Sequence, residues 1–179
     1  MESKYFICFK PKGDFYAFLK TLSGNIEMLN PQISALYKEE LLHVTFHKPI
    51  IGNYKQALSR AIEVAALRYS NTRVVLSGLG LFHDNIVVRI QPTYHIAKLW
   101  DDVRTLAEEV SGDKGDDDNM LHVTLFKKVP NIENVRLYEL TKSIPLTGLE
   151  FSFEYVCLFE KVYGGKWVEI QRLPLIGKN

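Results

Sequence analysis

The sequence has few of the features that mark secreted or membrane-spanning proteins. It contains only two cysteines, Cys8 and Cys157, and they stand in no metal-ligand spacing, so we expect two buried free thiols. No apolar run approaches the roughly 20 residues that span a membrane. The apolar run from Tyr5 to Phe9 is too short for a secretory signal. These absences predict a cytoplasmic protein with no membrane partner.

The sequence also lacks an excess of charge of either sign. Its 22 Lys and Arg residues nearly balance 21 Asp and Glu residues, which leaves a formal net charge of +1. Proteins that coat long nucleic acid need many phosphate contacts, so this balance argues against that class. A small ligand with one or two phosphates needs only a local positive patch. The length fits a single domain over residues 1–179, and we expect a monomer.

A short motif is present twice. Leu42-His43-Val44-Thr45 returns as Leu121-His122-Val123-Thr124, with the two histidines 79 positions apart (122 − 43), and each copy is followed three residues later by a lysine. Side chains alternate along a strand, so the histidine and threonine of each copy point the same way. Each copy therefore presents an imidazole beside a hydroxyl.

The hydrophobic pattern around the motifs predicts an α+β fold. Strands are expected at residues 4–10, 41–48, 73–82, 85–90, 120–129, 150–161 and 166–173, and helices from Asp14 to about Gly24, from Asn53, from Thr93 and at 132–142. Residues 111–119 are expected to form a polar loop, and Gly164-Gly165 a hairpin turn. This order predicts two pseudo-symmetric lobes of antiparallel sheet with outer helices. Each lobe holds one motif strand, and the two face a central cleft.

Two imidazoles and two hydroxyls brought together can cleave a phosphodiester without a metal. The unperturbed pKa of an imidazole, about 6.5, allows one ring to be neutral and the other charged near neutral pH. A single histidine in a strand is more often a packing residue, but the repeat favours a paired function. A metal site built from His43, His47 and His122 is a weaker alternative, because no carboxylate or cysteine stands at a useful spacing.

The paired His-x-Thr motifs resemble the hallmark of the 2H phosphoesterase superfamily, which contains LigT-like cyclic phosphodiesterases and 2′-5′ RNA ligase-like proteins. The segment from Leu76 to Phe82 and the C-terminal hairpin near Trp167 extend the resemblance. Leucine precedes each histidine where many relatives carry proline, and Lys127 stands where a basic residue often follows the second motif. The resemblance implies no cofactor and no metal.

The resemblance also implies the roles of the motif residues. His43 and His122 are the general base and general acid, and Thr45 and Thr124 bind the non-bridging phosphate oxygens. The sequence does not decide which histidine is the base. Candidate substrate-binding residues are aromatic or basic and lie near strand ends or turns: Phe82, Trp167, Tyr163, Phe126 and Lys127, of which Phe82 and Trp167 are preferred.

These residues predict a phosphodiesterase for a ribose-linked phosphodiester that involves the 2′-oxygen. A 2′,3′-cyclic phosphate, a 2′-5′ linkage as in oligoadenylate and a cyclic dinucleotide are all compatible with it, so the partner is a small nucleotide or an RNA terminus. One rival reading is a module that binds a nucleotide or RNA end without turnover. Another is a structural domain without a ligand.

Overall fold

The computed structural model describes residues 3–29, 42–46, 48–114, 120–127 and 143–177. In chain order the elements are β1 (Lys4–Phe9), α1 (Gly13–Leu29), β2 (Val44–Thr45), β3 (Ile50–Ile51), α2 (Lys55–Arg68), β4 (Thr72–Phe82), β5 (Asn85–Gln91), α3 (Tyr94–Ser111), β6 (His122–Phe126), β7 (Glu150–Phe153), β8 (Tyr155–Lys161) and β9 (Trp167–Pro174).

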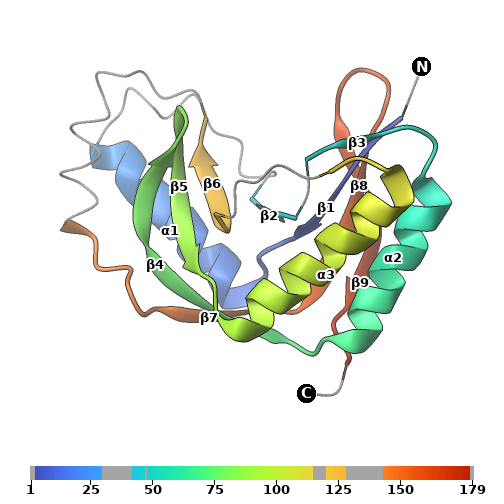
Figure 1. The fold of residues 1–179 in the computed structure, drawn as a ribbon. Coiled ribbons are helices and arrows are strands. Elements are labelled where there is room, and N and C mark those ends of the chain that lie inside the picture. Colours follow the sequence, from blue (N-terminus) through green and yellow to red (C-terminus); the bar gives the residue numbers. More distant parts are fainter. Residues whose placement is uncertain (1–2, 30–41, 47, 115–119, 128–142, 178–179) are drawn as a thin grey trace.

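The strands form two antiparallel sheets (Figure 1). We call the five-stranded one sheet A; its order is β2-β1-β8-β9, and β3 also pairs with β1. Sheet B has four strands in the order β6-β5-β4-β7. The first motif lies at one edge of sheet A and the second at one edge of sheet B. The predicted α+β fold, with one motif strand in each of two antiparallel sheets, is confirmed.

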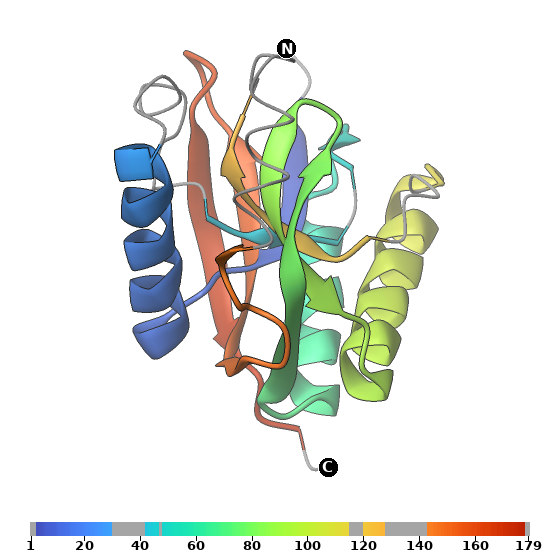
Figure 2. The ribbon, with the colours of Figure 1, turned by 90° about the vertical axis from the view of Figure 1, so that its left-hand side faces the viewer.

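The helices pack against these sheets through apolar stripes. Helix α2 contacts β8, β9 and α3, whereas α3 also contacts β4 and α1 contacts β7. Figure 2 shows α1 and α3 on opposite sides of the molecule. The buried residues of α3 recur every three or four positions, as a helix covering a sheet requires: Ile96, Leu99, Val103 and Ala107. No helix in the described part of the chain combines the length and the apolar character needed to cross a membrane.

Two predicted elements differ from the observed ones. Helix α1 does not end at Gly24 but continues to Leu29, because Ile26, four residues after Leu22, extends the buried stripe and outweighs a glycine cost of about 1 kcal/mol. The segment predicted as one strand over 150–161 is two strands. It breaks at Glu154, so that β7 joins β4 in sheet B while β8 joins β1 and β9 in sheet A.

Smaller differences concern element ends. Among the described residues of the predicted strand 41–48, only Val44 and Thr45 form the strand β2, where they pair with β1. Helix α2 begins at Lys55 after Tyr54, one residue later than a start capped by Asn53. The predicted turn at Gly164-Gly165 is confirmed, and both glycines have positive φ (85° and 78°), as a tight hairpin turn requires. The predicted helix over 132–142 lies outside the described residues.

Candidate functional site

The first motif shows the alternation that its sequence predicts. Leu42 and Val44 are each 1% exposed and belong to the main core. Between and after them, His43 is half-buried and Thr45 is exposed. Thr45 pairs with Cys8 of β1, so both project from the face of sheet A that carries a small second apolar cluster, formed by Phe6, Cys8, Cys157 and Phe159.

The second motif repeats this arrangement in sheet B. Leu121, Val123 and Leu125 are buried, whereas His122 and Thr124 are half-buried. His122 pairs with Arg89 of β5, and Thr124 pairs with Val87. The functional groups of both motifs therefore lie on the sheet face that turns away from the main core.

A backbone contact fixes the protonation of one ring nitrogen of His122. Its Nδ1 atom lies 2.7 Å from the carbonyl oxygen of Met120. A carbonyl oxygen only accepts hydrogen bonds, so Nδ1 carries a proton and donates it. In the neutral ring the lone pair is then on Nε2, which is the nitrogen that can take a proton from a ligand.

Each histidine also lies against a phenylalanine of its own sheet. The ring centroids of His43 and Phe6 are 4.9 Å apart at an interplanar angle of 32°, and those of His122 and Phe82 are 4.6 Å apart at 39°. These contacts restrict the rotation of both imidazoles. They also make the two halves of the site alike beyond the repeated motif.

The two motif strands lie against each other. Strand β2 is at an edge of sheet A, β6 is at an edge of sheet B, and the two strands are in contact. Figure 1 shows β2 and β6 at the edges where the two sheets face each other. A molecule bound where these strands meet is therefore within reach of residues from both copies of the motif.

The two preferred aromatic candidates both lie next to the motifs. Phe82 contacts His122 directly. Trp167 is half-buried and packs edge-on against Phe6, with centroids 4.7 Å apart, and Phe6 in turn contacts His43. The amino group of Lys161 lies 5.9 Å from the centre of the Trp167 ring. An aromatic ring is thus available on each side of the site.

Phe126 is a correction to the sequence prediction. It is fully buried in the main core, so its ring offers no surface for stacking on a base. The cause is a β-bulge: Val87 pairs with Thr124, but the preceding residue Ile86 pairs with Phe126, which leaves Leu125 as an extra residue. The bulge turns Phe126 toward the core side of the sheet, where Ile86 also packs.

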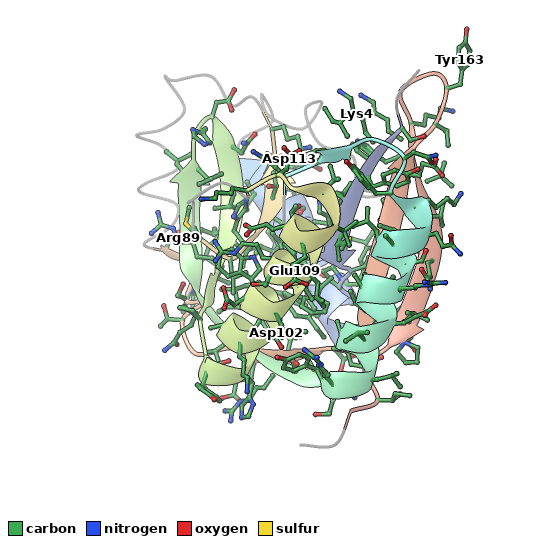
Figure 3. All side chains as sticks on the ribbon, turned by 45° about the vertical axis from the view of Figure 1, so that its right-hand side comes forward. Lys4, Arg89, Asp102, Glu109, Asp113 and Tyr163 are labelled. Carbon is green, nitrogen blue, oxygen red and sulfur yellow. The ribbon has the colours of Figure 1, made fainter. Side chains whose placement is uncertain are left out.

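The other candidates lie further out. Tyr163 is 91% exposed and projects from the tip of the β8–β9 hairpin (Figure 3). Lys127 is exposed just beyond the end of β6. His47, which the metal-site alternative needs, lies outside the described residues. Within the described part of the chain, no three His, Cys, Asp or Glu side chains cluster as metal ligands.

Several charged residues near the site were not predicted from the sequence. Lys10, Arg172 and Glu169 form an ion cluster in sheet A, with Lys10 Nζ 4.0 Å and Arg172 Nη2 2.6 Å from Glu169 carboxylate oxygens. In sheet B, Arg89 of β5 stands directly opposite His122 of β6 in the strand register. Lys10 lies on the same face as Phe6 and Cys8 by strand alternation, but its partner Glu169 on β9 depends on the order of strands in sheet A, which the sequence pattern does not contain.

Cavities elsewhere in the described part of the molecule do not include the motifs. One of about 620 Å³ lies at the start of α1 beside β7, and one of equal volume lies along the β8–β9 hairpin. Both have walls of mixed charge, with Lys12 and Glu154 lining the first and Lys4 and Glu160 the second. We assign neither cavity a role in the chemistry of the motifs.

Comparison with solved structures supports the fold prediction. The chain is similar to TT0787 of Thermus thermophilus, with 17% sequence identity, a TM-score of 0.71, and coverage of 98% of this chain and 100% of that one. It is also similar to E. coli LigT in complex with 3′-AMP, with 16% identity, a TM-score of 0.66, and coverage of 97% and 98%. A structure described as a phosphoesterase gives 16% identity, a TM-score of 0.70, and coverage of 98% and 99%.

Sequence comparison adds no relative to these. No protein-family model and no curated protein sequence matches the chain. The predicted resemblance to LigT-like proteins is therefore confirmed by the structure, at the level of the fold. The chain is likewise similar in fold to E. coli LigT in its apo form, with a TM-score of 0.66 over 97% of each chain.

Proposed function

We propose that this protein is a metal-independent phosphodiesterase that acts on a ribose phosphodiester involving the 2′-oxygen. The observation that carries the proposal is the position of the two His-x-Thr motifs on β2 and β6, edge strands of different sheets that lie against each other. Acid-base cleavage needs one group that takes a proton and one that gives a proton. The two imidazoles supply this pair, and the LigT-like fold supports the same chemistry.

In the proposed mechanism, one histidine removes a proton from water or a ribose hydroxyl, which attacks phosphorus. The other histidine gives a proton to the departing oxygen. At His122 the transfer occurs through Nε2, because Nδ1 is bound to the Met120 carbonyl. The hydroxyls of Thr45 and Thr124 donate hydrogen bonds to the non-bridging oxygens. Because the two halves are alike, the orientation of the substrate decides which histidine is the base.

The surroundings of the motifs favour a nucleotide substrate. Phe82 on one side and Trp167 on the other provide rings on which bases can stack. Lys161 adds a positive charge beside Trp167. That E. coli LigT has been solved with 3′-AMP supports the same class of ligand. The net charge of only +1 favours short nucleotides or RNA ends over long nucleic acid. We also propose that the protein acts as a monomer.

The proposal is tested by incubating the protein in chelator with a panel of phosphodiesters. The panel contains nucleoside 2′,3′-cyclic phosphates, 2′-5′ and 3′-5′ dinucleotides, and cyclic dinucleotides. We expect cleavage of at least one substrate with a 2′-linked phosphate, and no cleavage by the His43→Ala/His122→Ala double variant prepared in the same way. Binding without turnover would support the rival binding module. Loss of turnover in chelator, restored by zinc or manganese, would support the metal site instead.

A further inference from the structure

We propose that Arg89 binds a second phosphate of the substrate, one nucleotide away from the phosphodiester that is cleaved. This inference rests on the proposed function and makes it narrower. It implies that the preferred substrate is an oligonucleotide or a phosphorylated nucleotide, and not a nucleoside that carries a single cyclic phosphate.

Arg89 lies on the same face of sheet B as the second motif. It is the direct cross-strand partner of His122, and Val87, two residues earlier on β5, is the partner of Thr124. Directly paired residues of neighbouring strands point to the same face. Ile86, Val88 and Ile90 point to the other face and belong to the main core. Figure 3 shows Arg89 on sheet B, away from the hairpin that carries Tyr163.

A glycine leaves room for the Arg89 side chain over β4. A Cβ atom at Gly80 of β4 would overlap Nε, Cζ and Nη2 of Arg89, so the guanidinium lies directly on the backbone of that strand. Only a residue without a side chain leaves this space. The backbone of Gly80 is not in the left-handed region, so the glycine is needed for room and not for its conformation.

The floor between Arg89 and His122 is apolar and closed. Phe82 on β4 and His122 on β6 meet at 4.6 Å although β5 lies between their strands. Val87 on β5 is completely buried, yet it is not part of the main core. Its burial comes from the side chains that lie over this face. The Phe82 ring and the imidazole therefore form one continuous surface, and the guanidinium lies over Gly80 on the same face of the sheet.

No carboxylate among the described residues forms an ion pair with Arg89. Arg68, Arg73, Arg104 and Arg172 each form an ion pair with a carboxylate. Within the described part of the chain Arg89 has no such pair. An exposed planar guanidinium without a carboxylate partner among the described residues is well suited to bind a phosphate.

The position of the guanidinium indicates which phosphate it binds. Gly80 of β4, Val87 of β5 and Thr124 of β6 form one row across sheet B, and neighbouring strands are about 4.8 Å apart, so the guanidinium above Gly80 lies about 10 Å from the backbone of Thr124. Because the phosphate held by both motifs lies where β6 meets β2, on the side of β6 away from β4, this separation places the guanidinium at a different phosphate. It leaves room for a base on Phe82 and for the next phosphate at Arg89.

The inference is tested with matched substrates that differ in one phosphate. The pairs are nucleoside 2′,3′-cyclic phosphates with and without a 5′-phosphate, and 2′-5′ dinucleotides with and without a 5′-terminal phosphate. The wild-type protein is expected to prefer the phosphorylated member in kcat/KM by about tenfold to a hundredfold, the usual worth of a hydrogen bond between charged groups. The preference is expected to fall as ionic strength rises.

Variants connect this preference to Arg89. In Arg89→Ala the preference is expected to disappear, mainly through a higher KM for the phosphorylated substrate. Gly80→Ala is expected to reduce it as well, since the new methyl group displaces the guanidinium. Arg73→Ala, which removes an arginine of β4 paired with Glu150, and Gly24→Ala, at an open position in α1, are controls that keep the preference. Equal thermal unfolding midpoints exclude a general loss of structure.

Two results overturn the inference. Equal efficiency of the wild-type protein on both members of a pair contradicts it and leaves the proposed function intact. So does an Arg89→Ala variant that loses the same factor on both members, because the arginine then acts on the site as a whole. If the wild-type protein cleaves no member of any pair but cleaves a 2′-linked cyclic dinucleotide, the inference fails and the proposed function stands; if it cleaves no 2′-linked substrate at all, both fail.

Discussion

The ring of Phe82 lies 4.6 Å from the ring of His122, although the strands that carry them do not pair with each other. The contact passes over β5 and holds the imidazole from the side. Phe6 makes the corresponding contact with His43 in sheet A. In both halves of the molecule, a residue outside the repeated motif therefore orients the histidine within it.

We predict that Phe82→Leu lowers kcat about threefold to tenfold, because an aromatic contact of this kind contributes about 0.5–1.5 kcal/mol to the orientation of the ring. Steady-state kinetics on the substrate found with the panel measure the effect. Phe151→Leu is the matched control. Phe151 is in the same sheet, on β7, and packs against Phe15 and Phe18 of helix α1, away from the motifs. An equal loss in both variants would contradict a specific role for Phe82.

Trp167→Ala is expected to weaken substrate binding about 5-fold to 150-fold, the range for the loss of one stacked base, with a smaller change in kcat. Tyr163→Ala is the control from the same hairpin. Tyr163 is 91% exposed and points away from the sheets, so its removal is expected to leave binding unchanged. Ligand titration measures both. If Tyr163→Ala weakens binding as much as Trp167→Ala, the substrate lies along the hairpin tip instead.

Substitutions at two neighbouring residues of the second motif are expected to have different effects, one on stability and the other on activity. Leu125→Ala removes a fully buried side chain and should lower the free energy of unfolding by about 2–5 kcal/mol. Thr124→Ala changes a half-buried residue and should alter stability by about 0.5 kcal/mol or less while it lowers turnover. Urea denaturation and kinetics on the same samples test this. A strongly destabilised Thr124→Ala protein would show that the hydroxyl is structural.

The two buried thiols predict a loss of stability in alkaline solution. Burial raises the pKa of Cys157 from 9.0 to about 11, and burial together with the neighbouring Cys157 raises the pKa of Cys8 well above its usual value. The folded state then holds protons that the unfolded state releases. This contribution to stability is complete below about pH 9 and is lost as the pH rises toward 11.

Urea denaturation under reducing conditions at about pH 8 and about pH 10.5 measures this effect. The decrease in unfolding free energy between the two pH values is expected to be smaller in Cys157→Ala than in the wild-type protein. Cys157 also raises the pKa of Cys8, so the difference between the two proteins reports the loss of the Cys157 thiol together with its effect on Cys8. An identical decrease in the two proteins would contradict a raised pKa of Cys157.

Local patterns predicted much of the fold and of the motif geometry. The alternation of Leu42, His43, Val44 and Thr45 already indicates which side chains are buried, because a strand has only two faces. The stripe of α3 indicates its buried side in the same way. Such predictions succeed where buried and exposed side chains alternate with the period of a single strand or helix.

Features that depend on strand pairing could not be predicted in this way. The bulge opposite Ile86 turns Phe126 into the core, and it is a property of two strands and not of one. The pairing of Arg89 with His122 also depends on the order of strands in sheet B. The break at Glu154 is hidden for the same reason, because β7 and β8 both look like parts of one apolar strand until their partners are known.

The most direct test of the account is the kinetics of four proteins in chelator: the wild type, His43→Ala, His122→Ala and the double variant. Each single variant is expected to lose about 10²- to 10⁴-fold in kcat, the usual worth of a positioned acid or base. The double variant is expected to lose far less than the product of the two single losses, because the two imidazoles act together on one transition state. A His122→Ala protein with undiminished turnover would contradict the account.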